Sequence, residues 1–125
     1  MLVDTDVLIW CLRGNTGARR TLDKLKHYTV SSVTVMELLQ GVRDKQELRT
    51  IRAFLAQKHI THIVIDAAIS AKAIALLERF SLSHNLAFPD ALVAATAKRA
   101  GLTLLTGNRQ DYSFISGLKI RPFKP

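Results

Sequence analysis

The sequence predicts an α/β fold in which helices cover both faces of a mainly parallel sheet of four to five strands. Short apolar runs alternate along the chain with longer stretches at helical spacing. Strands that are separated by helices in this way form a parallel sheet that is buried on both faces. Apolar residues make up 48% of the 125 residues and charged residues 22%, ordinary values for a globular chain. We therefore expect one folded domain over residues 1–125 and exclude a disordered chain.

Short apolar runs predict the strands. The first run ends at Asp4, and the third ends just before Asp66, which is itself a suitable helix N-cap. The predicted strands cover residues 1–3, 28–32, 63–65 and 103–105, with residues 118–120 as the candidate fifth strand.

Helical spacing and capping signals predict six helices between these strands. Gly14 and Gly17 interrupt the first helical stretch, Pro89 suits the first turn of the last one, and Gly101 ends it after two basic residues. The last helix is rich in alanine and apolar throughout, so we expect it to be buried. The predicted helices cover residues 7–12, 18–27, 33–42, 44–59, 66–82 and 88–100.

Charge and cysteine content narrow the class of function. The chain has 18 Lys and Arg against 10 Asp and Glu, a formal net charge of +8 that favours polyanions such as nucleic acid. Its single cysteine, Cys11, forms no internal disulfide, which suits a reducing cytoplasm. No apolar run approaches the ~20 residues of a membrane span, and the N-terminus does not resemble a signal peptide. We expect a cytoplasmic protein without a membrane partner.

Half of the ten carboxylates have a sufficient local explanation. Four lie on polar helices beside Lys or Arg, and a fifth is the helix cap described above. These five are Asp23, Asp44, Glu47, Glu78 and Asp66. The remaining five are Asp4, Asp6, Glu37, Asp90 and Asp111.

The remaining carboxylates follow strands or begin helices. Asp4 directly follows the first strand, Glu37 lies on the helix after the second, Asp90 is in the first turn of the apolar helix, and Asp111 is in the loop after the fourth strand. Alone, each is explained by a turn, a solvated stripe or the helix dipole. Together they can converge at the carboxyl ends of parallel strands. A cluster of carboxylates needs cations between its members to stay ionised. Mg²⁺ or Mn²⁺ suits such oxygen ligands, and a pair of ions can activate water for phosphodiester cleavage.

Four ordered motifs carry a resemblance to a known family. They are LVDTDVLIW at residues 2–10, SSVTVMELLQG at 31–41, FPDALVAATAKRAGLTLLTGN at 88–108 and the RQDY that follows. In order and spacing the sequence resembles the PIN domain family, and in particular the VapC-type toxins of bacterial toxin–antitoxin systems. The resemblance implies a three-layer α/β/α sandwich and a metal-dependent endoribonuclease.

The resemblance also implies roles for particular residues. Asp4, Glu37 and Asp90 match the first three acidic positions of the family site, and Asp111 matches the fourth, a role that Asn108 could take instead. Asp4, Asp90 and Asp111 would hold Mg²⁺ or Mn²⁺, one or two ions per site, and Glu37 would bind a second ion or orient the attacking water. In-line attack would leave a 5′-phosphate and a 3′-hydroxyl. The implied accessory residues are Asp6, Thr106 and Asn108.

Basic and aromatic side chains complete the expected surface. Arg13, Arg43 and Arg109 neighbour acidic motifs and are candidates for RNA contact. A denser basic run on the second helix suits RNA contact and a solvated face equally; it comprises Arg19, Arg20, Lys24 and Lys26. Trp10 and Met36 are expected in the core or in a protein interface. No pair of histidines suggests a metal-free ribonuclease.

The resemblance implies partners as well. A VapB-like antitoxin would cover the cleft of a homodimer and form a larger hetero-oligomer with it. The substrate would be an RNA, whether tRNA, rRNA or mRNA.

Two other functions stay open at this point. LVDTDVL also resembles the nucleophile motif of haloacid-dehalogenase phosphatases, with Asp4 as nucleophile, Ser31 or Ser32 and Lys98 in support. That alternative leaves Glu37 and Asp90 without roles. The other alternative, a non-catalytic RNA-binding or interaction module, would not need four carboxylates near one end of a sheet.

Overall fold

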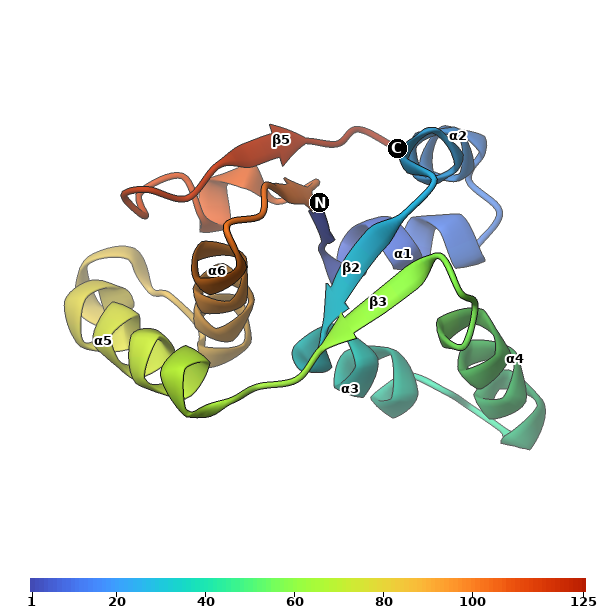
Figure 1. Ribbon diagram of the computed structural model, residues 1–125, viewed down its shortest axis with the longest axis horizontal. Helices are drawn as coiled ribbons and strands as arrows, with labels where there is room; N and C mark the ends of the chain where they lie inside the picture. Colours follow the sequence, from blue (N-terminus) through green and yellow to red (C-terminus); the bar gives the residue numbers. More distant parts are fainter.

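The computed structural model describes residues 1–125 and shows strands and helices alternating along the chain (Figure 1). The strands are β1 (Leu2–Val3), β2 (Tyr28–Ser31), β3 (Ile60–Ile63), β4 (Leu104–Thr106) and β5 (Ile120–Pro122). The helices are α1 (Thr5–Leu12), α2 (Thr16–Leu25), α3 (Ser32–Gln40), α4 (Lys45–Leu55), α5 (Ala67–His84) and α6 (Phe88–Ala100), and a 3₁₀ turn, η1, covers Arg109–Asp111.

The five strands form one sheet in the order β3-β2-β1-β4-β5, and every neighbouring pair is parallel. From β1 the chain adds β2 and β3 on one side, then crosses to place β4 and β5 on the other. The strand order therefore reverses between β1 and β4, where Leu2 pairs with Leu104 and Val3 with Leu105. Ligands of parallel sheets bind beyond the carboxyl ends of the strands at such a switch point.

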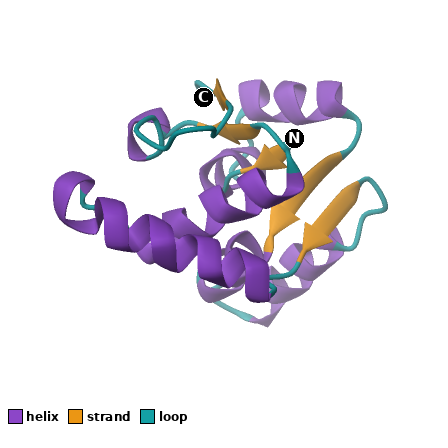
Figure 2. Cartoon of the chain, turned by 60° about the vertical axis from the view of Figure 1, so that its left-hand side comes forward, coloured by secondary structure: helices purple, strands orange, loops and turns teal.

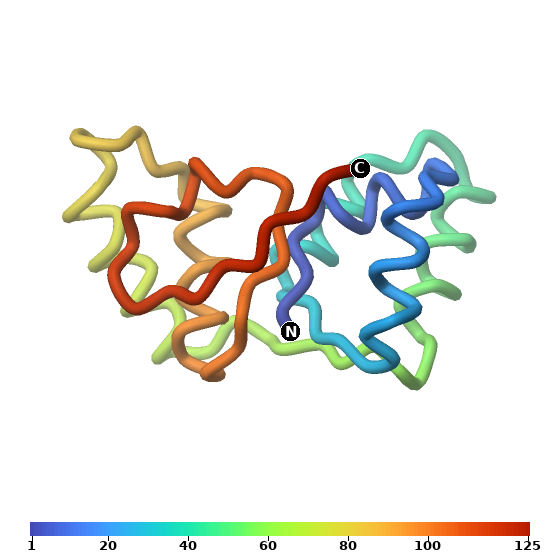
Figure 3. The backbone as a smooth tube through the Cα atoms, turned by 90° about the horizontal axis from the view of Figure 1, so that it is seen from above, coloured from blue at the N-terminus to red at the C-terminus, as the bar shows by residue number.

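Alternate side chains of the central strands face opposite layers of helices. Val3 and Leu105 belong to the apolar cluster that packs against α1, α2 and α4. Leu2 and Leu104 belong to the cluster that packs against α6, which α5 covers in turn. Figure 2 shows the sheet between the two groups of helices, and Figure 3 shows those groups on either side of the chain ends. The predicted α/β/α sandwich with a parallel sheet is confirmed.

Several predicted boundaries are wrong by a few residues. The third strand forms at Ile60–Ile63 and not at residues 63–65, because Thr61 and His62 pair with β2 although their side chains are exposed at the sheet edge. The fifth strand lies at Ile120–Pro122, two residues beyond the prediction. The helix predicted over residues 44–59 ends at Leu55, so that the chain can turn into β3.

The structure adds detail at three single residues. Asp44 is exposed, as expected for a surface charge, and it also caps α4, since its Oδ1 accepts from the backbone N–H of Glu47 at 2.8 Å. Met36 does not belong to the core, because 60% of it is exposed on α3. Trp10 is likewise 39% exposed, so neither residue lies in the core and a protein interface stays the expectation for both. None of the helices combines the length and hydrophobicity required to cross a membrane.

Candidate active site

Asp4 lies where β1 ends and α1 begins, and this position explains its surroundings. As the N-cap of α1 it accepts a hydrogen bond at Oδ1 from the backbone N–H of Thr5, at 2.9 Å. Its Oδ2 accepts from the Thr106 hydroxyl at 2.8 Å and from the Tyr112 hydroxyl at 3.1 Å. Only 7% of Asp4 is exposed. A strand end, a helix start and the segment after β4 thus fix one buried carboxyl group.

Burial dominates the acidity of Asp4. Desolvation raises the pKa of its carboxyl group to about 6, and the nearby charge of Asp6 raises it further, while donors from Thr106, Thr5 and Tyr112 act in the opposite direction. The ionised form therefore costs free energy at neutral pH in the absence of a cation. A divalent ion beside the carboxylate would remove that cost.

Tyr112 joins Asp4 to Asp90. Its hydroxyl lies 3.1 Å from Oδ2 of Asp4 and 3.1 Å from Oδ1 of Asp90, and its ring is buried in the cluster beneath α6. Asp90 occupies the first turn of α6, one residue after Pro89. Burial raises the pKa of Asp90, as do the charges of three other acidic residues; these are Asp111, Glu37 and Asp6. Asp90 therefore lies within the electrostatic reach of the other carboxylates.

Glu37 is connected to the same region through two threonines. The Thr5 hydroxyl donates to Oε1 of Glu37 at 2.7 Å and lies 2.9 Å from the hydroxyl of Thr34. Because Thr5 immediately follows Asp4, this contact brings α3 to the beginning of α1. The Glu37 side chain itself is exposed at the surface. Sequence reasoning did not identify either threonine, although Thr34 and Glu37 lie one helical turn apart.

Asp6 holds an oxygen atom without a partner. Its Oδ2 accepts from the backbone N–H of Gly107 at 2.8 Å, whereas its Oδ1 is buried with no hydrogen bond. Burial is the main reason that the pKa of Asp6 is raised. A Cβ atom at Gly107 would stand 2.5 Å from Oδ2 of Asp6, so glycine permits this contact. Like Thr5 and Thr34, Gly107 is not singled out by the sequence pattern.

The segment after β4 supplies Thr106, Asn108 and Asp111. Thr106 accepts from the backbone N–H of Asn108 at 3.0 Å while donating to Asp4, so it links this segment to β1. The Asn108 side chain forms no hydrogen bond within the protein. Asp111 is exposed in η1, and its charge raises the pKa of both Asp6 and Asp90.

The donor set suits a hard divalent cation. All ligands within reach are oxygen atoms, the Oδ1 of Asp6 lacks a partner, and burial disfavours the ionised forms of three carboxyl groups. No three Asp, Glu, His or Cys side chains are grouped closely enough here to hold an ion by themselves. Mg²⁺ commonly keeps several water ligands, so one or two carboxylates with water satisfy its coordination.

Two of the predicted basic residues border the acidic region. Arg13 and Arg43 line an open groove of about 510 Å³ between α1, α3 and α4, and Glu37 lines it with them. Arg43 also forms an exposed ion pair of 2.7 Å with Glu47. Arg109 is exposed in η1, two residues from Asp111. The basic run of α2 borders a different cavity, which includes Arg19, Lys26 and Cys11.

The residues that a dehalogenase-type phosphatase would need are engaged elsewhere. Ser31 caps α3, and the hydroxyl of Ser32 lies 2.7 Å from Nε2 of His62. Lys98 lies eight residues after Asp90, about 12 Å along the axis of α6. The fold therefore does not place a serine and a lysine around Asp4.

Comparison with known proteins agrees with this arrangement. The model of the PIN domain family matches residues 1–114. A ribonuclease VapC10 from Mycobacterium tuberculosis is 32% identical over 125 residues, covering 95% of this chain and 90% of that protein. A tRNA(fMet)-specific endonuclease VapC from Shigella flexneri is 25% identical, with 94% and 93% covered.

A solved structure shows the same fold. A toxin–antitoxin complex from Klebsiella pneumoniae contains a chain with a TM-score of 0.79 and 29% identity, which covers 99% of this chain and 98% of its own length. The family model spans most of the sequence, and the fold and order of motifs agree with it; the chain belongs to the PIN domain family.

Proposed function

We propose that this protein is a metal-dependent endoribonuclease and the toxin of a VapBC-type toxin–antitoxin module, formed by one domain over residues 1–125. The relatives named as ribonuclease and endonuclease support the activity, and the toxin–antitoxin complex supports the biological setting. The observation that carries the proposal is the buried Asp4 carboxylate, fixed by three donors beside the unpartnered oxygen of Asp6.

Asp4, Asp90 and Asp111 would hold Mg²⁺ or Mn²⁺, as one or two ions, together with water ligands, since the three carboxyl groups do not by themselves surround an ion. When bound, the metal would supply the Lewis acidity that makes water a nucleophile at neutral pH. The hydroxyls of Thr106 and Tyr112 keep Asp4 in place, and Tyr112 does the same for Asp90. These contacts set the separation of the two carboxylates before any ligand arrives, which lowers the reorganisation needed for catalysis.

The other residues contribute to orientation and substrate binding. Glu37, held by Thr5, would orient the attacking water or bind a second ion, and Asp6 would contact the ion through water. Arg13, Arg43 and Arg109 would bind phosphates of the RNA at the border of the acidic region. The attack breaks the bond between phosphorus and the 3′ oxygen, leaving a 5′-phosphate and a 3′-hydroxyl.

The proposed partners follow the same reasoning. RNA is the substrate, whether tRNA, rRNA or mRNA, and a VapB-like antitoxin is the inhibitor, bound to a homodimer in the cytoplasm. An antitoxin arginine or lysine that reached the cluster of Asp4, Asp90 and Asp111 would compete with the metal for their negative charges.

The test is cleavage of a total tRNA and rRNA pool by the purified chain with Mg²⁺, with Mn²⁺ and with EDTA. We expect metal-dependent bands that Asp90→Asn abolishes. Asp23→Asn is the matched control, because it removes one exposed negative charge from α2, outside the acidic cluster of the candidate active site. Bands that persist in EDTA, or in Asp90→Asn at full strength, would refute the proposal.

A further inference from the structure

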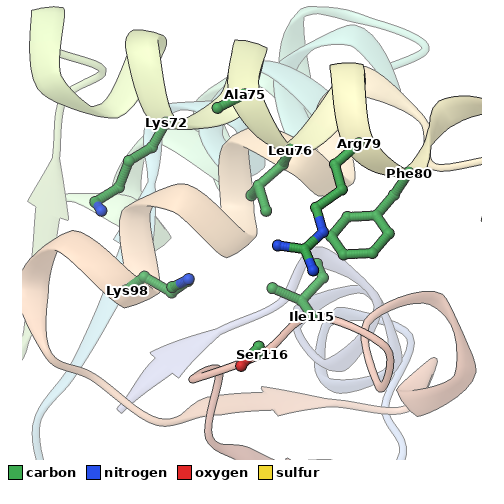
Figure 4. Close-up of a pocket in the computed structure, with 8 residues that line it drawn as sticks. All are labelled: Lys72, Ala75, Leu76, Arg79, Phe80, Lys98, Ile115 and Ser116. Atoms are coloured by element: carbon green, nitrogen blue, oxygen red, sulfur yellow. The ribbon is translucent and has the colours of Figure 1, made fainter.

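A second charged region lies at the other end of α6 from Asp90. An open pocket of about 190 Å³ is lined by residues of α5, α6 and the segment before β5. Figure 4 shows Arg79 extending from α5 and Lys98 extending from α6 toward the space above Ser116, whereas the end of the Lys72 side chain turns away from Arg79 and Ser116 at the edge of the pocket. Lys72 and Arg79 are seven residues apart, or two helical turns, which places them on one side of α5.

The three cations have no acidic partner within the chain. The only ion pair within 4.0 Å in the whole protein joins Arg43 to Glu47, at the beginning of α4. Lys72, Arg79 and Lys98 thus line one pocket without an ion-pair partner. An anion in that pocket would accept charge-assisted hydrogen bonds from Lys98 and Arg79.

Four apolar and four polar residues line the pocket, and the polar ones carry groups that bind compact anions. Lys98 is partly buried and lies against Gly117, where a Cβ atom would be 3.7 Å from its Cε. Ser116 presents a hydroxyl group beside it. The Arg79 guanidinium lies 5.3 Å from the centre of the Phe80 ring, which limits its freedom. Arginine and lysine held in this way are common ligands of phosphate groups.

The pocket and the acidic cluster of the candidate active site lie at opposite ends of α6 and of the segment beside it. Asp90 and Lys98 mark the two ends of α6, while Tyr112 and Ser116 mark the corresponding ends of the neighbouring segment. The two regions are thus about 12 Å apart along the helix.

We propose that Lys72, Arg79, Lys98 and Ser116 form a phosphate site that binds the backbone of the RNA substrate away from the cleaved bond. This inference rests on the proposed ribonuclease function for the identity of the ligand. It adds a second point of attachment, which would fix the register of the strand relative to Asp90 without reading its bases.

Two binding measurements test the site without requiring cleavage. In the first, the Asp90→Asn chain binds a labelled single-stranded 12-nucleotide RNA, followed by fluorescence anisotropy over a range of salt concentrations. The triple variant K72A/R79A/K98A is compared with K45A/R49A/R52A, which removes the same charge from exposed positions of α4. We expect the first triple variant to bind about tenfold more weakly or worse, and the control to change far less.

In the second measurement, inorganic phosphate is titrated into the same chain and the amide signals are followed by NMR. We expect saturable shifts at Ser116 and Gly117 that disappear in K72A/R79A/K98A. Thermal unfolding verifies that both triple variants fold.

Equal weakening by the two triple variants would overturn the site, since it would show a non-specific effect of charge. A change of oligomeric state in K72A/R79A/K98A with unchanged RNA binding would also overturn it and would assign the region to a protein interface. Failure of the ribonuclease proposal is distinguishable, because it appears as absent cleavage by the unmodified chain whatever the phosphate titration shows.

Discussion

The Tyr112 hydroxyl lies 3.1 Å from Oδ1 of Asp90, and the same hydroxyl reaches Oδ2 of Asp4 at an equal distance. A phenol has one proton, so it donates to one carboxylate at a time and the pair competes for it. Burial, together with the negative charges of Asp4 and Asp90, raises the pKa of Tyr112, so the phenol stays protonated. Tyr112 is a positioning residue that ties the end of β1 to the beginning of α6.

Tyr112→Phe tests this role, because the ring still fills the core while the hydroxyl is lost. We expect affinity for Mn²⁺ and the rate of RNA cleavage to fall by about 10- to 100-fold. We also expect the pH profile of cleavage to move to higher pH, since Asp4 loses a donor that lowers its pKa. Calorimetry with Mn²⁺ and cleavage rates between about pH 5 and 8, a range that brackets the raised pKa of Asp4 of about 6, measure both effects.

Tyr28→Phe is the matched control, because Tyr28 is also buried but belongs to the cluster beneath α1 and α2. An unchanged pH profile and metal affinity in Tyr112→Phe would contradict a positioning role. Changes of the same size in Tyr28→Phe would assign the effect to packing.

The raised pKa of Asp4 predicts an unusual dependence of stability on pH. Between the ordinary value of 3.8 and the folded value of about 6, the folded chain binds more protons at Asp4 than the unfolded chain does. Raising the pH through this window therefore favours unfolding, by about 3 kcal/mol in total for this group. We expect the free energy of unfolding of the metal-free protein to fall as the pH rises through this window. In Asp4→Asn we expect it to fall much less.

Denaturant unfolding of both chains in EDTA at several pH values measures this difference. Added Mn²⁺ at pH 7 is expected to restore stability to the unmodified chain and not to Asp4→Asn. Parallel curves for the two chains across the window would show that Asp4 does not titrate in the way its burial implies.

The contact between Thr5 and Glu37 predicts a pair of substitutions with opposite outcomes. Thr5→Val removes the hydroxyl that holds Glu37 at 2.7 Å and leaves Thr34 without its partner at 2.9 Å. We expect about tenfold slower cleavage and a loss of about 1 kcal/mol in stability. Thr5→Ser keeps the hydroxyl and should restore most of the rate. Equal rates for the valine and serine variants would exclude a role for this hydrogen bond.

Gly107 predicts a steric effect on Asp6. In Gly107→Ala the new Cβ would stand 2.5 Å from Oδ2 of Asp6 and 3.4 Å from the carbonyl oxygen of Phe123, so the Asp6 side chain must move. We expect weaker Mn²⁺ binding with a modest loss of stability. Gly41→Ala is the control, because its Cβ would meet only ordinary contacts at 3.5 Å. Unaltered Mn²⁺ binding in Gly107→Ala would remove Asp6 from the proposed site.

The sequence was sufficient to predict the parallel fold because strand and helix periods are local properties. It also drew attention to Asp4 and Asp90, since a strand end and the first turn of a buried helix can be located without tertiary structure. The third strand was misplaced because the prediction followed the apolar run at 63–65, whereas pairing with β2 selects Ile60–Ile63.

The residues that organise the site were harder to find. Tyr112, Thr5 and Gly107 act through contacts with residues that are remote in sequence, and none belongs to a residue type that signals metal chemistry. Lys72, Arg79 and Lys98 each resemble ordinary surface charge along the chain. Only the packing of α5 against α6 brings them to one cavity.

The most direct test is to measure Mn²⁺ binding by electron paramagnetic resonance and RNA cleavage on the same samples. The chains compared are the unmodified protein, Asp90→Asn, Asp111→Asn and Asn108→Ala. We predict that binding and cleavage are lost together in Asp90→Asn, are reduced together in Asp111→Asn and are largely kept in Asn108→Ala. Cleavage by the unmodified chain without bound metal, or undiminished Mn²⁺ binding in Asp90→Asn, would contradict a carboxylate-held metal as the basis of the activity.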